Sequence, residues 1–181
     1  MKNLFYFILI AFAFSSCNEF TKIQKSDDHD FKAEKALAYY ADKKYDKAAT
    51  LLEMVIPYKR LSPNFEELYY KYSYCHYYLH DFYLANYYFK SFAKQFPSST
   101  LSEDALFMAA LCSVKNSPNY QLDQGETQSA IDELQLFMNR FPESPKKDTC
   151  NLIIDALVIK LEKKAFENAY LYYKTENYKS A

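Results

Sequence analysis

One short pattern occurs three times along this chain and restricts the folds that the chain can adopt. In each copy an alanine is followed, four and seven residues later, by large apolar residues, and the copies begin at Ala48, Ala85 and Ala130. The alanines are 37 and 45 residues apart. Apolar residues spaced by four and three predict one face of a helix, and a repeat of this length predicts a stack of helical hairpins.

The segment that ends a predicted hairpin is also repeated. FAKQFPSS at residues 92–99 returns as FMNRFPES at residues 137–144. Two phenylalanines four positions apart lie on one helical face, so they can fill the seam to the next hairpin. The proline is expected to end the helix, as is Pro57 earlier in the chain, and the serine is expected to cap the helix that follows. The repeated alanine is expected where two helices cross closely, because a larger side chain would separate them.

The repeat resembles the tetratricopeptide repeat. The predicted fold class is therefore all-α, a right-handed α-solenoid of tetratricopeptide-type helical hairpins. We expect hairpins at about 31–60, 63–97, 100–142 and 145–181, the last of them incomplete. The aperiodic segment 115–125 is expected to be a loop, which accounts for the longer second spacing. Because Tyr178 and Ala181 match Tyr45 and Ala48, the sequence is expected to be C-terminally truncated.

Composition excludes several classes of function. The 181 residues suffice for one domain. The formal net charge is −1 and no stripe of lysine and arginine is present, so the charge pattern does not indicate nucleic-acid binding. No catalytic arrangement of side chains is evident, so we expect neither an enzyme nor a cofactor. His76 and His80 have the spacing of metal ligands but lack a third, so no metal site is expected. Cys75, Cys112 and Cys150 are expected to be buried thiols, although one disulfide stays possible in an exported protein.

The N-terminus has the pattern of an export signal. Lys2 precedes an apolar run from Leu4 to Phe14, which is shorter than the roughly 20 residues that a membrane-spanning helix needs. Small residues then lead to Cys17, as in the lipobox of bacterial lipoproteins. We expect residues 1–16 to be a lipoprotein signal peptide, Cys17 to carry palmitate-type acyl chains, and residues 17–30 to be a flexible tether. The alternative is an ordinary signal peptide with an incidental cysteine.

Tyrosine is concentrated in one stretch, with nine tyrosines between Tyr69 and Tyr88. Helical periodicity assigns Tyr69, Tyr72 and His76 to the seam of a hairpin. It assigns Tyr70, Tyr74, Tyr77 and Tyr78 to the opposite side of the helix. This side is expected to line the concave groove of the solenoid. Tyrosine suits peptide binding because it combines apolar area, a polar tip and few rotatable bonds. The alternative is that these rings pack between hairpins or form a surface without a ligand.

Together, the lipobox at Cys17, the two Phe-Pro-x-Ser joints and the segment LDQGETQSAIDEL resemble the BamD family of outer-membrane assembly lipoproteins. The resemblance covers about residues 17–181 and implies a scaffold of the β-barrel assembly machinery, anchored by lipid in the outer membrane and facing the periplasm. It implies unfolded outer-membrane β-barrel proteins and BamA-like assembly subunits as partners. Asn18 after Cys17 agrees with this destination. The alternative is another repeat-containing adaptor lipoprotein of the cell envelope, serving pilus or peptidoglycan machinery.

Overall fold

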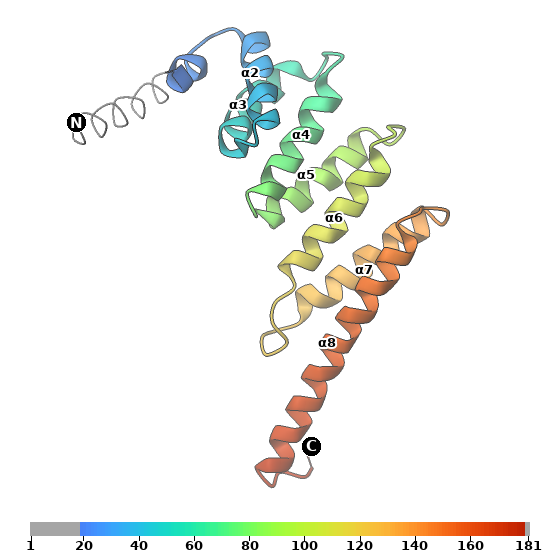
Figure 1. The fold of residues 1–181 in the computed structure, drawn as a ribbon. Coiled ribbons are helices and arrows are strands. Elements are labelled where there is room, and N and C mark those ends of the chain that lie inside the picture. Colours follow the sequence, from blue (N-terminus) through green and yellow to red (C-terminus); the bar gives the residue numbers. More distant parts are fainter. Residues whose placement is uncertain (1–18, 180–181) are drawn as a thin grey trace, which may run out of the picture. The chain divides into compact units, whose positions relative to one another are not determined.

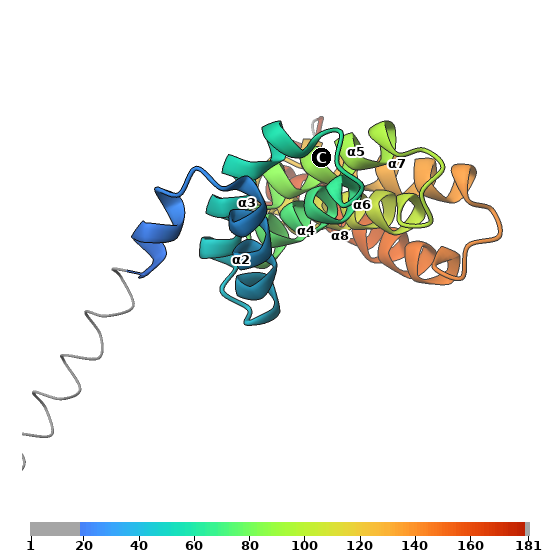
Figure 2. The ribbon, with the colours of Figure 1, turned by 90° about the horizontal axis from the view of Figure 1, so that it is seen from above.

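The computed structural model describes residues 19–179, and its ordered elements over that range are helices, with no strand. The described part of the chain divides after His80 into two compact units. Within each unit the helices lie antiparallel to their neighbours in the chain (Figure 1), and the view from above shows the same helix-on-helix packing (Figure 2). This all-helical architecture confirms the predicted fold class and is that of a tetratricopeptide-like helical solenoid.

The first unit holds the N-terminal helices. Residues 19–24 are helical and are followed by α2 (His29–Ala41), α3 (Tyr45–Lys59) and α4 (Phe65–Tyr78). A tight turn, in which Lys43 has a positive φ of 60°, joins α2 to α3. Helix α3 packs against both α2 and α4. The tyrosine-rich segment therefore lies on the last helix of this unit.

The second unit holds α5 (Phe82–Gln95), α6 (Ser102–Asn116), α7 (Gly125–Arg140) and α8 (Lys147–Lys174). Each helix packs against the next one along the chain. Between α6 and α7 the predicted loop is present as residues 117–124, which explains why the second repeat is longer. The core of α6, α7 and the start of α8 is apolar, with Phe107, Leu134 and Phe137 among its buried side chains.

The repeated apolar positions are all buried, as the pattern predicts. Ala48, Ala85 and Ala130 have no exposed surface. The residues four and seven positions after each alanine are buried as well, namely Leu52, Val55, Phe89, Phe92, Leu134 and Phe137. The three copies of the sequence pattern therefore mark three equivalent faces of α3, α5 and α7.

The repeated joint has the same geometry in both places. The ring centres of Phe92 and Phe96 are 5.0 Å apart and their planes are inclined by 43°, while Phe137 and Phe141 give 5.4 Å and 42°. The serines differ from expectation, because α6 begins at Ser102 and α8 at Lys147 without a side-chain cap. Ser99 Oγ instead accepts from the Leu101 amide, and Ser144 Oγ from the Lys146 amide. Each serine thus stabilises the turn before the helix rather than the helix terminus.

Pro57 does not end its helix, contrary to the prediction. Helix α3 continues through Pro57 to Lys59. The proline lies in the last turn, where only one intrahelical hydrogen bond is lost at its nitrogen and few residues remain to be displaced. The helix boundary therefore falls two residues later than the proline suggests.

The predicted tether at residues 17–30 needs correction over its described part. Ile23 is 3% exposed, and the Phe20 ring meets the Tyr39 ring edge-on at 5.7 Å. Asp28 is exposed but is also the N-cap of α2, since its Oδ1 accepts from the Asp30 and Phe31 amides at 2.9 Å. Residues 19–24 are thus packed on the first hairpin, because their apolar side chains find partners on α2.

Candidate functional site

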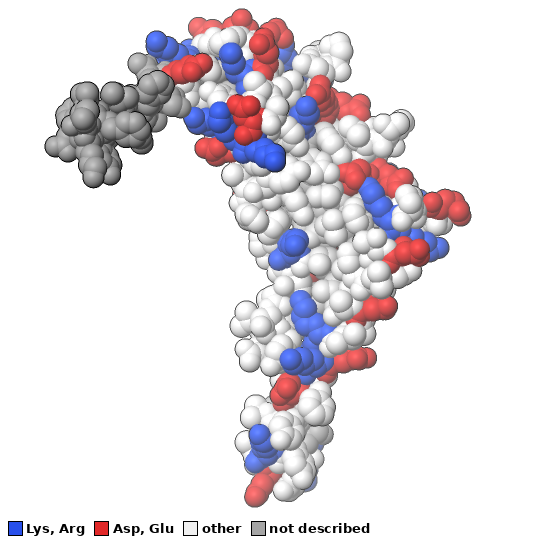
Figure 3. All heavy atoms as spheres, viewed as in Figure 1, with Lys and Arg blue, Asp and Glu red and all other residues white. Residues whose placement is uncertain are grey.

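An aromatic surface covers the side of α4 that the sequence assigns to the groove. Tyr70, Tyr74 and Tyr77 are half-buried, and Tyr78 is 43% exposed. On the face shown in Figure 3, the surface over the C-terminal half of α4 is almost free of charged side chains. The four predicted groove residues therefore lie together and remain within reach of a ligand.

The rings of this surface contact one another in a chain along the helix. The Tyr70 and Tyr74 ring centres are 5.0 Å apart, and those of Tyr74 and Tyr78 are 5.8 Å apart. The Tyr77 ring contacts both of the last two rings, with its centre 6.4 Å from that of Tyr74 and 5.7 Å from that of Tyr78. Because each ring restricts its neighbour, the surface is largely formed before any ligand binds, which lowers the entropic cost of binding.

Two tyrosines of the first hairpin extend this surface and were not identified from the sequence. Tyr45, at the start of α3, stacks on Tyr78 with ring centres 4.3 Å apart and planes inclined by 19°. Tyr40, in the last turn of α2, meets Tyr45 edge-on at 5.6 Å. The repeat matches Tyr45 to Tyr178, but a match along the sequence gives no contact with the helix that follows. We call these six residues the tyrosine cluster: Tyr40, Tyr45, Tyr70, Tyr74, Tyr77 and Tyr78.

The tyrosine cluster is partly shielded from water, since five of its six tyrosines are partly buried. Burial raises the pKa of the Tyr40 phenol well above its ordinary value of 10.0, and Tyr78, Cys75 and Tyr45 raise it further. The Lys71 amine lies 5.4 Å from the centre of the Tyr40 ring and pairs with Glu67 at 2.8 Å. A neutral hydroxyl at Tyr40 can donate a hydrogen bond, so the cluster offers apolar faces together with polar tips.

The residues assigned to the seam are less uniform than predicted. Tyr72 is buried and meets the His76 ring edge-on at 4.8 Å, whereas Tyr69 and His76 are only partly buried. His80 lies in the turn after α4 with a positive φ of 62°. Across residues 19–179 no group of three or more histidine, cysteine, aspartate or glutamate side chains is arranged to hold a metal ion.

The remaining predictions concern the cysteines and the membrane. Cys17 lies outside the described residues. Cys75, Cys112 and Cys150 are buried free thiols, and burial raises the pKa of Cys75 and Cys112 to about 12. No helix in residues 19–179 is long and apolar enough to cross a bilayer.

Paired helices, with fully buried alanines on α3, α5 and α7, define a tetratricopeptide-like helical solenoid that carries an aromatic surface on α4. The sequence profile of the YfiO family, described as outer membrane lipoprotein, matches residues 27–181. The chain belongs to this family of outer membrane lipoproteins, whose members are helical scaffolds rather than enzymes. No curated protein matches the chain.

Proposed function

We propose that this protein is a lipid-anchored scaffold of the β-barrel assembly machinery, attached through Cys17 to the outer membrane and facing the periplasm. Its clients are unfolded outer-membrane β-barrel proteins, and it joins BamA-like assembly subunits. Membership of the YfiO family supports the location and the scaffold class. The tyrosine cluster supports a client site, because its rings contact one another and together present an aromatic surface.

The chemistry of the tyrosine cluster suits an unfolded β-strand. Such a strand presents an apolar side chain at every second residue and unpaired backbone amides between them. The stacked pair Tyr45 and Tyr78 offers flat apolar area to the side chains. Tyrosine hydroxyls offer donors and acceptors to the backbone, so binding needs no particular client sequence.

Photo-crosslinking in living cells tests this function. A photoreactive phenylalanine at position 78 is expected to capture newly exported β-barrel proteins. The same residue at position 58 is the matched control, because Tyr58 is 68% exposed in the same unit but stacks on His29 outside the cluster. Capture at position 78 of only wall enzymes or pilus subunits would instead support the envelope-adaptor alternative and refute barrel assembly.

A binding measurement with purified components complements the crosslinking. A urea-unfolded β-barrel protein carrying a fluorophore is diluted into the full-length protein, and anisotropy reports the complex. Replacing both Tyr74 and Tyr78 by alanine is expected to weaken binding about tenfold or more, since buried aromatic anchors dominate such interfaces. Tyr58→Ala is expected to leave the affinity unchanged. Equal affinities for all three proteins would refute the tyrosine cluster as the client site.

A further inference from the structure

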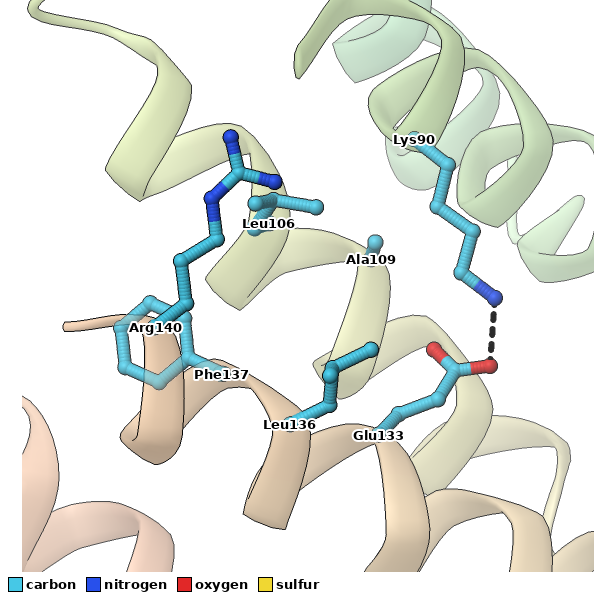
Figure 4. A pocket seen from close by; sticks show the side chains of 7 residues that line it. All are labelled: Lys90, Leu106, Ala109, Glu133, Leu136, Phe137 and Arg140. Atoms are coloured by element: carbon cyan, nitrogen blue, oxygen red, sulfur yellow. Dashed lines mark hydrogen bonds and ion pairs between the residues drawn. The ribbon is translucent and has the colours of Figure 1, made fainter. Parts of the chain in front are cut away.

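A second candidate binding site lies in the other unit, on the face where α5, α6 and α7 meet. It is a pocket of about 110 Å³ with an apolar floor made by Leu106, Ala109 and Phe137. Leu136, which is 67% exposed, forms part of its rim. Figure 4 shows Lys90 and Glu133 on one side of the pocket and Arg140 on the other. An apolar hollow of this size fits a single aliphatic or small aromatic side chain.

The walls of the pocket are held by polar contacts that cross from helix to helix. Lys90 on α5 pairs with Glu133 on α7 at 2.6 Å. The Asn86 side-chain amide donates to the Ala109 carbonyl at 2.8 Å, to Ser113 Oγ at 2.9 Å and to Glu133 Oε2 at 3.0 Å. These bonds connect all three helices directly beside the pocket. The three helices that form the pocket are therefore held together beside it.

The charges at the two sides are not equivalent. The Lys90 charge is neutralised by Glu133. Arg140 is exposed, and within residues 19–179 its guanidinium has no carboxylate partner; it lies 5.7 Å from the centre of the Phe141 ring. Among the residues that line the pocket, Arg140 therefore carries a positive charge without a carboxylate partner, and guanidinium is the group best suited to bidentate binding of a carboxylate.

We propose that this pocket binds a partner protein segment in which an apolar side chain is next to an acidic one. The apolar side chain fills the hollow over Ala109, and the carboxylate pairs with Arg140. The commitment to a protein segment rests on the pocket size, which suits one side chain, and on the charge that Arg140 leaves uncompensated. This site is separate from the tyrosine cluster, and the proposal does not depend on the proposed client function.

Titration with defined peptides, followed by methyl NMR of the full chain, tests this site. The probe is a capped hexapeptide, acetyl-Ser-Gly-Leu-Glu-Gly-Ser-amide, compared with versions that carry lysine for glutamate or serine for leucine. The leucine–glutamate peptide is expected to produce saturable shifts of the Leu106, Ala109 and Leu136 methyl signals. Both altered peptides are expected to bind about tenfold more weakly, one for lack of the charge pair and one for lack of the apolar contact.

A charge exchange makes the test decisive. Arg140→Glu is expected to reverse the preference, so that the leucine–lysine peptide becomes the better ligand. Arg60→Glu is the matched control, because Arg60 is the other arginine of the sequence and lies outside this unit. Leu136→Ser is expected to weaken every leucine peptide without changing the charge preference. Absence of saturable shifts at the pocket methyls, or an unchanged preference in Arg140→Glu, would overturn the proposal while leaving the tyrosine cluster untouched.

Discussion

At the scale of single residues, the three repeated alanines leave no room for a larger side chain. Each has no exposed surface, so a larger side chain at these positions could not extend into solvent. The side chain must displace a neighbouring helix or adopt a strained rotamer, and close-packed interiors resist both. The requirement for a small residue is therefore a requirement of the crossing itself.

Ala130→Leu is expected to lower the free energy of unfolding by about 1–3 kcal/mol, the usual cost of overpacking a core. Urea denaturation followed by circular dichroism measures the change. Ala169→Leu is the control, because Ala169 lies on the exposed side of α8 in the same unit. If the two variants are equally stable, α7 does not require a small residue at its crossing.

Tyr40 makes the stability of the first unit sensitive to alkaline pH. Its pKa is raised in the folded protein mainly by burial, so the unfolded phenol ionises near pH 10 while the folded one keeps its proton. Above that pH the unfolded state binds fewer protons, and stability falls as pH rises. Tyr40→Phe is expected to lessen the loss between pH 9 and pH 11 in urea titrations, whereas Tyr58→Phe is not. Equal losses in both variants would show that Tyr40 does not carry the effect.

At the scale of elements, the loop between α6 and α7 is ordered by a chain of hydrogen bonds. Lys160 on α8 donates to Ser117 Oγ at 2.6 Å and to the Pro118 carbonyl at 3.1 Å. Ser117 and Thr127 hydroxyls are 2.6 Å apart, and Thr127 donates to Gln124 Oε1 at 2.7 Å. The Gln124 amide in turn donates to loop carbonyls, and Lys164 donates to the Leu122 carbonyl. The inserted residues are thus fastened to α7 and α8.

Thr127→Val tests this network because it removes the hydroxyl while nearly keeping the volume. Thr127 is fully buried, so Gln124 and Ser117 each lose a partner, at a cost of about 1–3 kcal/mol. Hydrogen exchange of the amides in residues 117–124 is expected to become faster. Thr100→Val, at an exposed threonine, serves as the control. Unchanged exchange in Thr127→Val would show that the loop is ordered by other contacts.

The sequence predicts the elements well and their connections less well. The spacing of alanine and apolar residues identifies α3, α5 and α7 because burial imposes a 3.6-residue period. The helix boundaries predicted from Pro57 and from the serines of the joints were wrong, because a helix end depends on local turn geometry, which a single residue type does not determine. The same periodicity places Tyr70, Tyr74, Tyr77 and Tyr78 on one side of α4, whereas Tyr40 and Tyr45 join the cluster through contacts between helices. Arg140 carries no sequence signal, since its lack of a partner is a property of the folded unit.

At the scale of the whole molecule, apolar surface is unevenly distributed. The second half of α8 exposes several large apolar side chains, among them Phe166 at 67% and Leu171. The Phe166 and Tyr170 rings stack with their centres 6.0 Å apart, so these two side chains form one exposed aromatic patch. Contiguous exposed apolar area of this kind binds apolar probes.

The dye anilinonaphthalene sulfonate is therefore expected to bind the folded protein at α8. Replacing both Phe166 and Leu171 by glutamate is expected to reduce the dye fluorescence strongly. Leu61→Glu is the control, because Leu61 is fully exposed in the loop after α3 and does not belong to this surface. A similar reduction by Leu61→Glu would show that the dye reports exposed leucine in general.

The packed helix at residues 19–24 limits how far the protein could move from a bilayer. An extended chain spans at most about 3.5 Å per residue. With a lipid on Cys17, as proposed, the two-residue step to position 19 would span roughly 7 Å. Because Ile23 is buried and the Phe20 ring contacts Tyr39, residues 19–24 do not act as a flexible linker. The α2 helix, whose Tyr39 ring contacts Phe20, would then be held close to the anchored end of the chain.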